Sequence, residues 1–139
     1  MSSFHWYRLT ILTALAAAGA CLFPSEPCAC VLPPPAALAV GTVTHLSGNP
    51  APGARVVAES WRPPCDSVPA GFLLASDTAS TDAQGAFRLV VIGLQEGNQC
   101  ARITARLGAA EASRIVAVHT RHDVRLEFLD SVRVDLTLP

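Results

Sequence analysis

The feature that most constrains the fold is a succession of short segments, from Ala37 onward, in which apolar and polar residues alternate between turn residues. Successive side chains of a β-strand point to opposite faces of its sheet, so strict alternation is typical of a strand with one buried and one wet face. The clearest segment alternates Val132, Val134, Leu136 and Leu138 with Arg133, Asp135 and Thr137. No helical periodicity follows residue 20, which disfavours an α/β architecture. The sequence therefore predicts an all-β domain.

Eight strands are expected, and their spacing is typical of a sandwich of two sheets. We predict strands near residues 38–46, 54–61, 73–80, 86–92, 99–107, 113–119, 123–128 and 132–138. The apolar positions of these strands suffice for a single core. The inward positions include Ala54, Val56, Ala58, Phe87, Leu89, Val91, Ala101, Ile103, Ala105, Leu107, Val124, Leu126 and Phe128.

Two glycine-containing corners mark reversals of the chain. Asp82-Ala-Gln-Gly85 has Asp first and Gly fourth, which suits a type I turn whose glycine takes a positive φ. Gly53 follows Pro50 and Pro52, and proline is excluded from the interior of a sheet ladder. We therefore place turns at both corners.

These elements resemble the carboxypeptidase regulatory-like domain. The matching segments are Gly41 to Val43, Gly48 to Val56, Thr81 to Leu89, and Leu94 to Gly97. The tyrosine that usually follows the last segment is replaced here by Gln99 or Cys100. The resemblance implies a seven- to eight-stranded antiparallel sandwich, Ig-like and transthyretin-like, that serves as a non-catalytic accessory or adhesive module.

The amino-terminal segment has the features of an export signal. Arg8 supplies a positive charge, and the apolar run from Leu9 to Ala20 is shorter than the roughly 20 residues that cross a bilayer as a helix. We expect a signal peptide at residues 1–20, a Pro-rich tether at 21–36 and the β-sandwich domain at 37–139.

Cys21 follows Ala18-Gly19-Ala20, and this segment is compatible with two kinds of processing. It resembles a bacterial lipobox, which would make Cys21 a lipidated amino terminus, and residue 22 is not the Asp that would argue for inner-membrane retention. It also satisfies the small-x-small rule of ordinary secretion. The expected location is the cell envelope, with an outer-membrane lipoprotein as the first hypothesis and a secreted or periplasmic protein as the alternative.

The remaining cysteines fit an oxidising compartment. We predict a disulfide between Cys65 and Cys100. A bridge between Cys28 and Cys30 would strain disulfide geometry. These two residues could stay reduced, staple the tether, pair with another chain or bind a soft metal.

The sequence offers two weaker candidate sites. His119 and His122, with Asp123 adjacent, could hold zinc or copper, although such histidines more often face solvent. Trp61 beside Arg62 could stack on a sugar ring, although core packing or cover for a Cys65 bridge is the simpler role. Sandwich enzymes that cleave catechol rings bind iron through tyrosine and histidine, and the single tyrosine, Tyr7, lies in the leader.

The function that fits these features is a non-enzymatic, exported β-sandwich, anchored in a membrane through lipid on Cys21, that assists another envelope protein or binds a glycan. Neither His-x-x-Glu, His-Glu-x-x-His, Gly-x-Ser-x-Gly nor a phosphate loop occurs, and we expect no cofactor. The formal net charge of −1 gives no electrostatic reason for nucleic-acid binding. The alternatives are a secreted carbohydrate-binding module and a metal- or thiol-dependent envelope protein.

Overall fold

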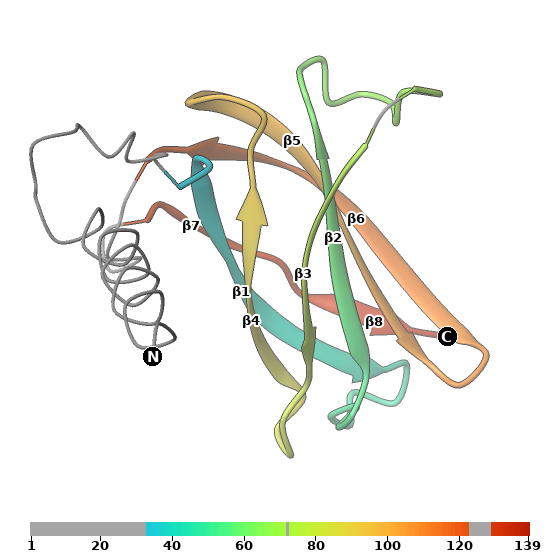
Figure 1. Cartoon of the computed structure of the whole chain (residues 1–139). Coiled ribbons are helices and arrows are strands. Elements are labelled where there is room, and N and C mark those ends of the chain that lie inside the picture. Colours follow the sequence, from blue (N-terminus) through green and yellow to red (C-terminus); the bar gives the residue numbers. More distant parts are fainter. Residues whose placement is uncertain (1–32, 72, 123–128) are drawn as a thin grey trace, which may run out of the picture. The chain divides into compact units, whose positions relative to one another are not determined.

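Two four-stranded β-sheets pack face to face in the part of the chain that the structure describes (Figure 1). The structure, a computed structural model, describes residues 33–71, 73–122 and 129–139, all within one unit spanning Leu32–Pro139. The first sheet has the order β4-β1-β7, with β8 also paired to β1, and the second has the order β3-β2-β5-β6. The strands are β1 Ala36–His45, β2 Arg55–Trp61, β3 Leu74–Ser80, β4 Ala86–Ile92, β5 Gly97–Leu107, β6 Ala110–Thr120, β7 Ser131–Arg133 and β8 Leu136–Leu138.

This architecture confirms the predicted all-β sandwich and most of its strands. The predicted strand at 123–128 lies outside the described residues, as do the signal peptide and all of the tether up to residue 32. Within the described ranges, no helix is long and apolar enough to cross a membrane.

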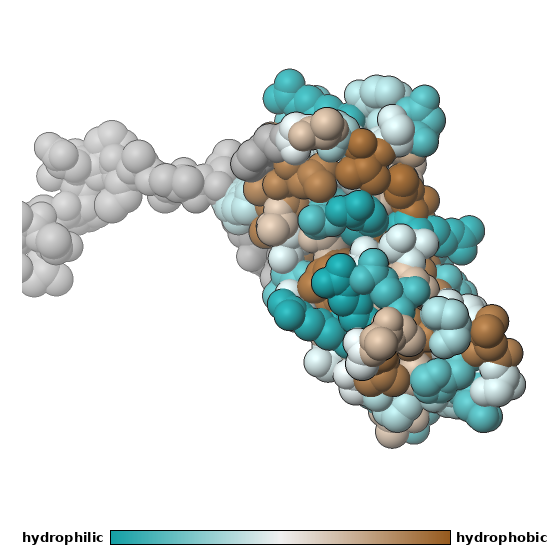
Figure 2. Space-filling model, turned by 90° about the vertical axis from the view of Figure 1, so that its right-hand side faces the viewer, coloured by the Kyte–Doolittle hydropathy of each residue, from teal (hydrophilic) through white to brown (hydrophobic). Residues whose placement is uncertain are grey.

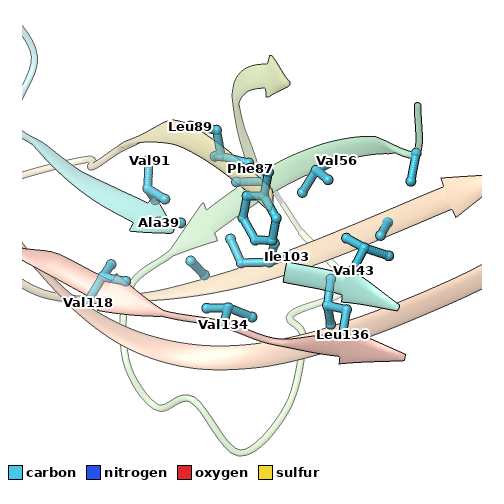
Figure 3. Close-up of a cluster of buried hydrophobic side chains, with 14 of the residues drawn as sticks. Ala39, Val43, Val56, Phe87, Leu89, Val91, Ile103, Val118, Val134 and Leu136 are labelled. Carbon is cyan, nitrogen blue, oxygen red and sulfur yellow. The ribbon is translucent and has the colours of Figure 1, made fainter. Parts of the chain in front are cut away.

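The core lies between the two sheets, and alternation along the strands builds it. Side chains from β1 and β4 of the first sheet point toward side chains from β2 and β5 of the second (Figure 3). The predicted inward residues Val56, Leu89 and Ile103 are at most 2% exposed. Small residues such as Ala39, Ala58 and Ala101 are also buried, which lets the sheets approach closely.

One end of the core is polar. Ser60 donates a hydrogen bond to the carbonyl of Ile92 at 2.5 Å, and Thr120 donates to that of Gln95 at 2.7 Å. Gln99 on β5 pairs with Val118 on β6 and is fully buried, and its side-chain amide has no hydrogen-bond partner among the described residues. Gln99 therefore faces inward with Ala101 and Ile103, whereas Cys100 lies on the opposite face of β5.

The carboxyl-terminal segment differs from the prediction. We expected one strand at 132–138 in an antiparallel sandwich, but β7 and β8 are separate segments that both pair with β1 in parallel. The chain between them passes so close to Gly41 that a Cβ atom there would lie 1.8 Å from the carbonyl oxygen of Val134. Gly41 permits this approach because it has no side chain.

Asp135 bridges the interruption between β7 and β8. One carboxylate oxygen accepts hydrogen bonds from the backbone N–H of Thr42 at 3.0 Å and from its hydroxyl at 2.9 Å. The other accepts one from Nε of Arg133 at 3.0 Å. The hydrogen bond from Arg133 lowers the pKa of Asp135, and partial burial opposes it. The side chain thus replaces a missing ladder contact to β1.

The two predicted corners are joined by hydrogen bonds. Gly85 has a φ of +73° and donates its N–H to the carbonyl of Asp82 at 3.0 Å, as expected for the turn. The buried hydroxyl of Thr81 donates to the carbonyl of Ala51 at 2.6 Å and accepts from the N–H of Ala54 at 2.8 Å. The proline-rich corner is therefore fastened to the start of the β3–β4 turn.

Replacement of Gly41 by Ala is expected to lower the free energy of unfolding by about 3 kcal/mol, because the new methyl group overlaps the backbone at Val134. Chemical denaturation measures the change. Gly71→Ala is the matched control, since no atom lies within 4 Å of a Cβ at that exposed glycine, and it should change stability by less than about 0.5 kcal/mol. Equal effects of the two substitutions would contradict the close approach at Gly41.

Asp135 should make stability depend on acid pH. Its pKa is lower in the folded state than in the unfolded chain, so its contribution is present above the unfolded-state value and is lost as pH falls through the folded-state value. This exposed carboxylate should contribute on the order of 0.5–1 kcal/mol. Unfolding titrations between about pH 2 and 6 should show a smaller acid-induced loss for Asp135→Asn than for the wild type. Parallel pH profiles would contradict this role.

Candidate functional site

The outer face of the second sheet presents three rows of side chains that cross all four strands, and nine of these twelve side chains are polar. These residues alternate with the core residues Val56, Ala58, Ile103 and Ala105, so they point away from the core. The strand register defines the rows as Ser80, Arg55, Arg106 and Glu111; Thr78, Val57, Thr104 and Ser113; and Ala75, Glu59, Arg102 and Ile115.

A groove of about 350 Å³ lies on this face, and its lining includes residues from all three rows. The middle row carries short side chains and forms the floor, whereas the arginines and glutamates of the outer rows form the walls. We call it the polar groove. Figure 2 shows one face of the molecule, on which hydrophilic residues lie between more hydrophobic areas.

Two ion pairs lie in the walls. Arg102 donates hydrogen bonds from Nε, at 2.9 Å, and from a terminal nitrogen to one carboxylate oxygen of Glu59, and both side chains are one-third exposed. On the opposite wall, Nε of Arg106 donates to Glu111, and this pair is more exposed. Each pair joins directly opposed residues on neighbouring strands, Glu59 with Arg102 across β2 and β5 and Arg106 with Glu111 across β5 and β6.

Arg55 is the remaining charged residue of the groove. It is exposed, lies directly opposite Arg106 on the neighbouring strand, and has no carboxylate partner within 4 Å among the described residues. With three arginines and two glutamates in the lining, the groove carries one excess positive charge. It can therefore supply guanidinium donors, carboxylate acceptors and hydroxyl groups to a polar ligand.

Cys65 and Cys100 form the predicted disulfide, with a Cα–Cα distance of 5.3 Å. Cys100 lies on the outer face of β5, one row beyond the polar groove, and is directly opposite Trp61 on β2. Cys65 belongs to the loop after β2, so the bridge fastens that loop to the sheet.

Trp61 does not form the predicted ligand-binding surface. Its side chain is only 2% exposed, and its indole Nε1 donates a hydrogen bond to the carbonyl of Pro64 at 3.2 Å. Stacking on a sugar requires an accessible ring. This placement supports the simpler role, in which Trp61 packs beside the Cys65–Cys100 disulfide. Arg62 is exposed but is not part of the polar groove.

The ring nitrogens of His119 and His122 lie close to different polar partners and share none among the described residues. Nδ1 of His119 is 3.1 Å from the side-chain oxygen of Asn98, and Nδ1 of His122 is 2.6 Å from the carbonyl of Pro33. The backbone N–H of His122 donates to Glu96. Among the described residues no three His, Cys, Asp or Glu side chains form a metal-binding group. Asp123, Cys21, Cys28 and Cys30 lie outside those residues.

The sequence pattern alone did not reveal the polar groove. Charged residues alternate along β2 and β5, as in Arg55-x-Val57-x-Glu59 and Arg102-x-Thr104-x-Arg106, which indicates one polar face on each strand. The rows form only when these strands are aligned with β3 and β6. That alignment is set by the register of strand pairing.

No protein family model matches the chain, and no curated protein matches it. Solved structures with some likeness include chlorocatechol 1,2-dioxygenase from Pseudomonas putida, at 13% identity and TM-score 0.45, covering 74% of this chain and 59% of that one. 3-Chlorocatechol 1,2-dioxygenase from Rhodococcus opacus 1CP shows 14% identity and TM-score 0.44, with 81% and 63% covered.

The dioxygenase domain of a dioxygenase carbohydrate-binding protein fusion from Streptomyces sp. SirexAA-E shows 16% identity and TM-score 0.42, with 78% of this chain and 82% of that one covered. The chain spans about three-fifths of the length of the first two proteins. No functional property is carried over from likenesses of this degree.

Removal of the disulfide by the double substitution Cys65→Ala, Cys100→Ala should lower the free energy of unfolding by about 4 kcal/mol, because the bridge restricts the unfolded chain over a separation of 35 residues. Thermal unfolding with and without dithiothreitol measures the effect. The reductant should lower the melting temperature of the wild type and leave that of the double variant unchanged. A wild type insensitive to complete reduction would contradict the prediction.

Proposed function

We propose that this chain is a non-enzymatic, exported β-sandwich of the carboxypeptidase regulatory-like kind, anchored by lipid on Cys21 in a bacterial envelope. Its role is to bind or support another envelope component. The Cys65–Cys100 disulfide is the observation that carries the proposal, because such bridges persist in exported proteins and are rare in the reducing cytosol.

The corner and turn segments support the family resemblance. Thr81 joins the Ala51–Ala54 corner to the Asp82–Gly85 turn through buried hydrogen bonds. These are the segments whose residues resemble the carboxypeptidase regulatory-like domain. They act as structural connections, which fits a module whose recognition surface lies on a sheet face.

The polar groove supports a binding role. Its volume of about 350 Å³ is at the lower end of the range for ligand sites, and its walls are held by cross-strand ion pairs. A rigid sheet that presents oriented charged groups can bind a polar partner with little reorganisation.

The alternative roles have less support from the described side chains. The proposed sugar platform at Trp61 is buried, so a carbohydrate-binding module would need another surface. A metal-dependent role would need His119 and His122 to exchange their present hydrogen-bond partners for a shared ion.

Lipid attachment is tested by metabolic labelling of cells that express the full chain with a radioactive fatty acid. We expect label on the wild type and on Cys28→Ser, the matched control, and none on Cys21→Ser. Absence of label from the wild type would overturn the lipid anchor. Label retained by Cys21→Ser would place the modification at another residue.

A further inference from the structure

We propose that the polar groove binds an acidic oligosaccharide, with a carboxylate of the sugar paired to Arg55. The inference rests on the binding role proposed above, but it does not depend on lipid at Cys21 or on Trp61. It assigns the recognition surface to the outer face of the β3-β2-β5-β6 sheet.

The charge of the groove favours an anionic group near Arg55. Arg55 and Arg106 lie directly opposite each other on antiparallel strands, and like charges in this position disfavour the sheet. Arg106 is paired with Glu111, whereas Arg55 has no carboxylate partner among the described residues. A ligand carboxylate beside Arg55 would neutralise the excess charge and could accept two parallel hydrogen bonds from the guanidinium.

The floor of the groove favours hydroxyl groups on the same ligand. Thr78, Thr104 and Ser113 lie in one row around Val57, and each hydroxyl can both donate and accept a hydrogen bond. The row crosses four strands, or about 14 Å at the usual strand spacing. This length is greater than one sugar ring, so the fitting ligand is an oligomer with hydroxyl groups along its length.

The wall formed by Glu59 and Arg102 also offers hydrogen-bond partners for sugar hydroxyl groups. Glu59 and Arg102 form a half-buried pair that presents acceptor and donor groups side by side. Vicinal sugar hydroxyls both donate and accept hydrogen bonds, so they can join such a pair without breaking it. The two walls thus differ, with a neutral pair on one side and an excess cation at Arg55 on the other.

An acidic peptide fits the groove less well. Extended peptides usually bind by adding a strand to a sheet edge, where backbone groups are unpaired. The groove lies on the face of the sheet, and the backbone groups of the central strands β2 and β5 are engaged in ladders on both sides. A peptide backbone in the groove could therefore form hydrogen bonds only with side chains. Side chains are sufficient partners for the hydroxyl groups of a sugar.

The test is titration calorimetry of the full chain with uronate trimers, namely trigalacturonate, a glucuronate trimer and a mannuronate trimer, each compared with its own methyl ester as the neutral probe. We expect at least one acidic trimer to bind and esterification to weaken binding at least about tenfold. Arg55→Gln should weaken binding at least about tenfold, and binding should weaken as salt is raised. Arg88→Gln is the matched control, an exposed arginine on β4 of the other sheet, and should leave affinity within about twofold.

Three outcomes would overturn the inference. These are no binding of any acidic trimer, binding that Arg55→Gln leaves unchanged, or binding of a hexaglutamate peptide as tight as that of the best trimer. Retained thermal unfolding transitions in both variants show that they are folded. Because fatty-acid labelling is measured separately, failure of the glycan titration is distinguishable from failure of the lipid anchor.

Discussion

The close approach of the chain at Val134 to Gly41 is the contact on which the first sheet depends. It allows the segment at residues 131–138 to lie beside β1 in two parallel pieces, with Val134, Leu136 and Leu138 buried against the second sheet. A side chain at position 41 would overlap a backbone carbonyl, and a backbone group cannot relieve the overlap by changing its rotamer. Where the ladder to β1 is interrupted, the carboxylate of Asp135 accepts the hydrogen bond from the backbone N–H of Thr42.

The two faces of the second sheet have separate tasks. The inner face, with Val56, Ile103 and Ala105, closes the core. The outer face carries the Trp61 and disulfide cluster at one end and the polar groove in the middle. Because the inner residues and the loop after β2 fix the positions of β2 and β5, the wall residues of the groove project from a backbone that is held on both sides.

The sequence predicted what depends on local chemistry. Alternation located the strands around Phe87 and Ile103, and the Asp82–Gly85 pattern located a turn. Parallel pairing of 131–138 was missed because alternation specifies faces and carries no information on strand direction. Trp61 was placed in the right strand, but its burial depends on the loop that folds over it. The groove was missed because its rows arise from register between strands distant in sequence.

The pairing of β1 with β8 sets when the domain can fold. Residues 36–45 emerge from the ribosome early, yet their parallel partners reach to Leu138, so the first sheet stays incomplete until nearly all of the described segment has been synthesised. Long-range pairings of this kind form slowly. A chain whose strand pairing is completed this late remains unfolded during its synthesis, and an unfolded chain is what the export proposed above would require.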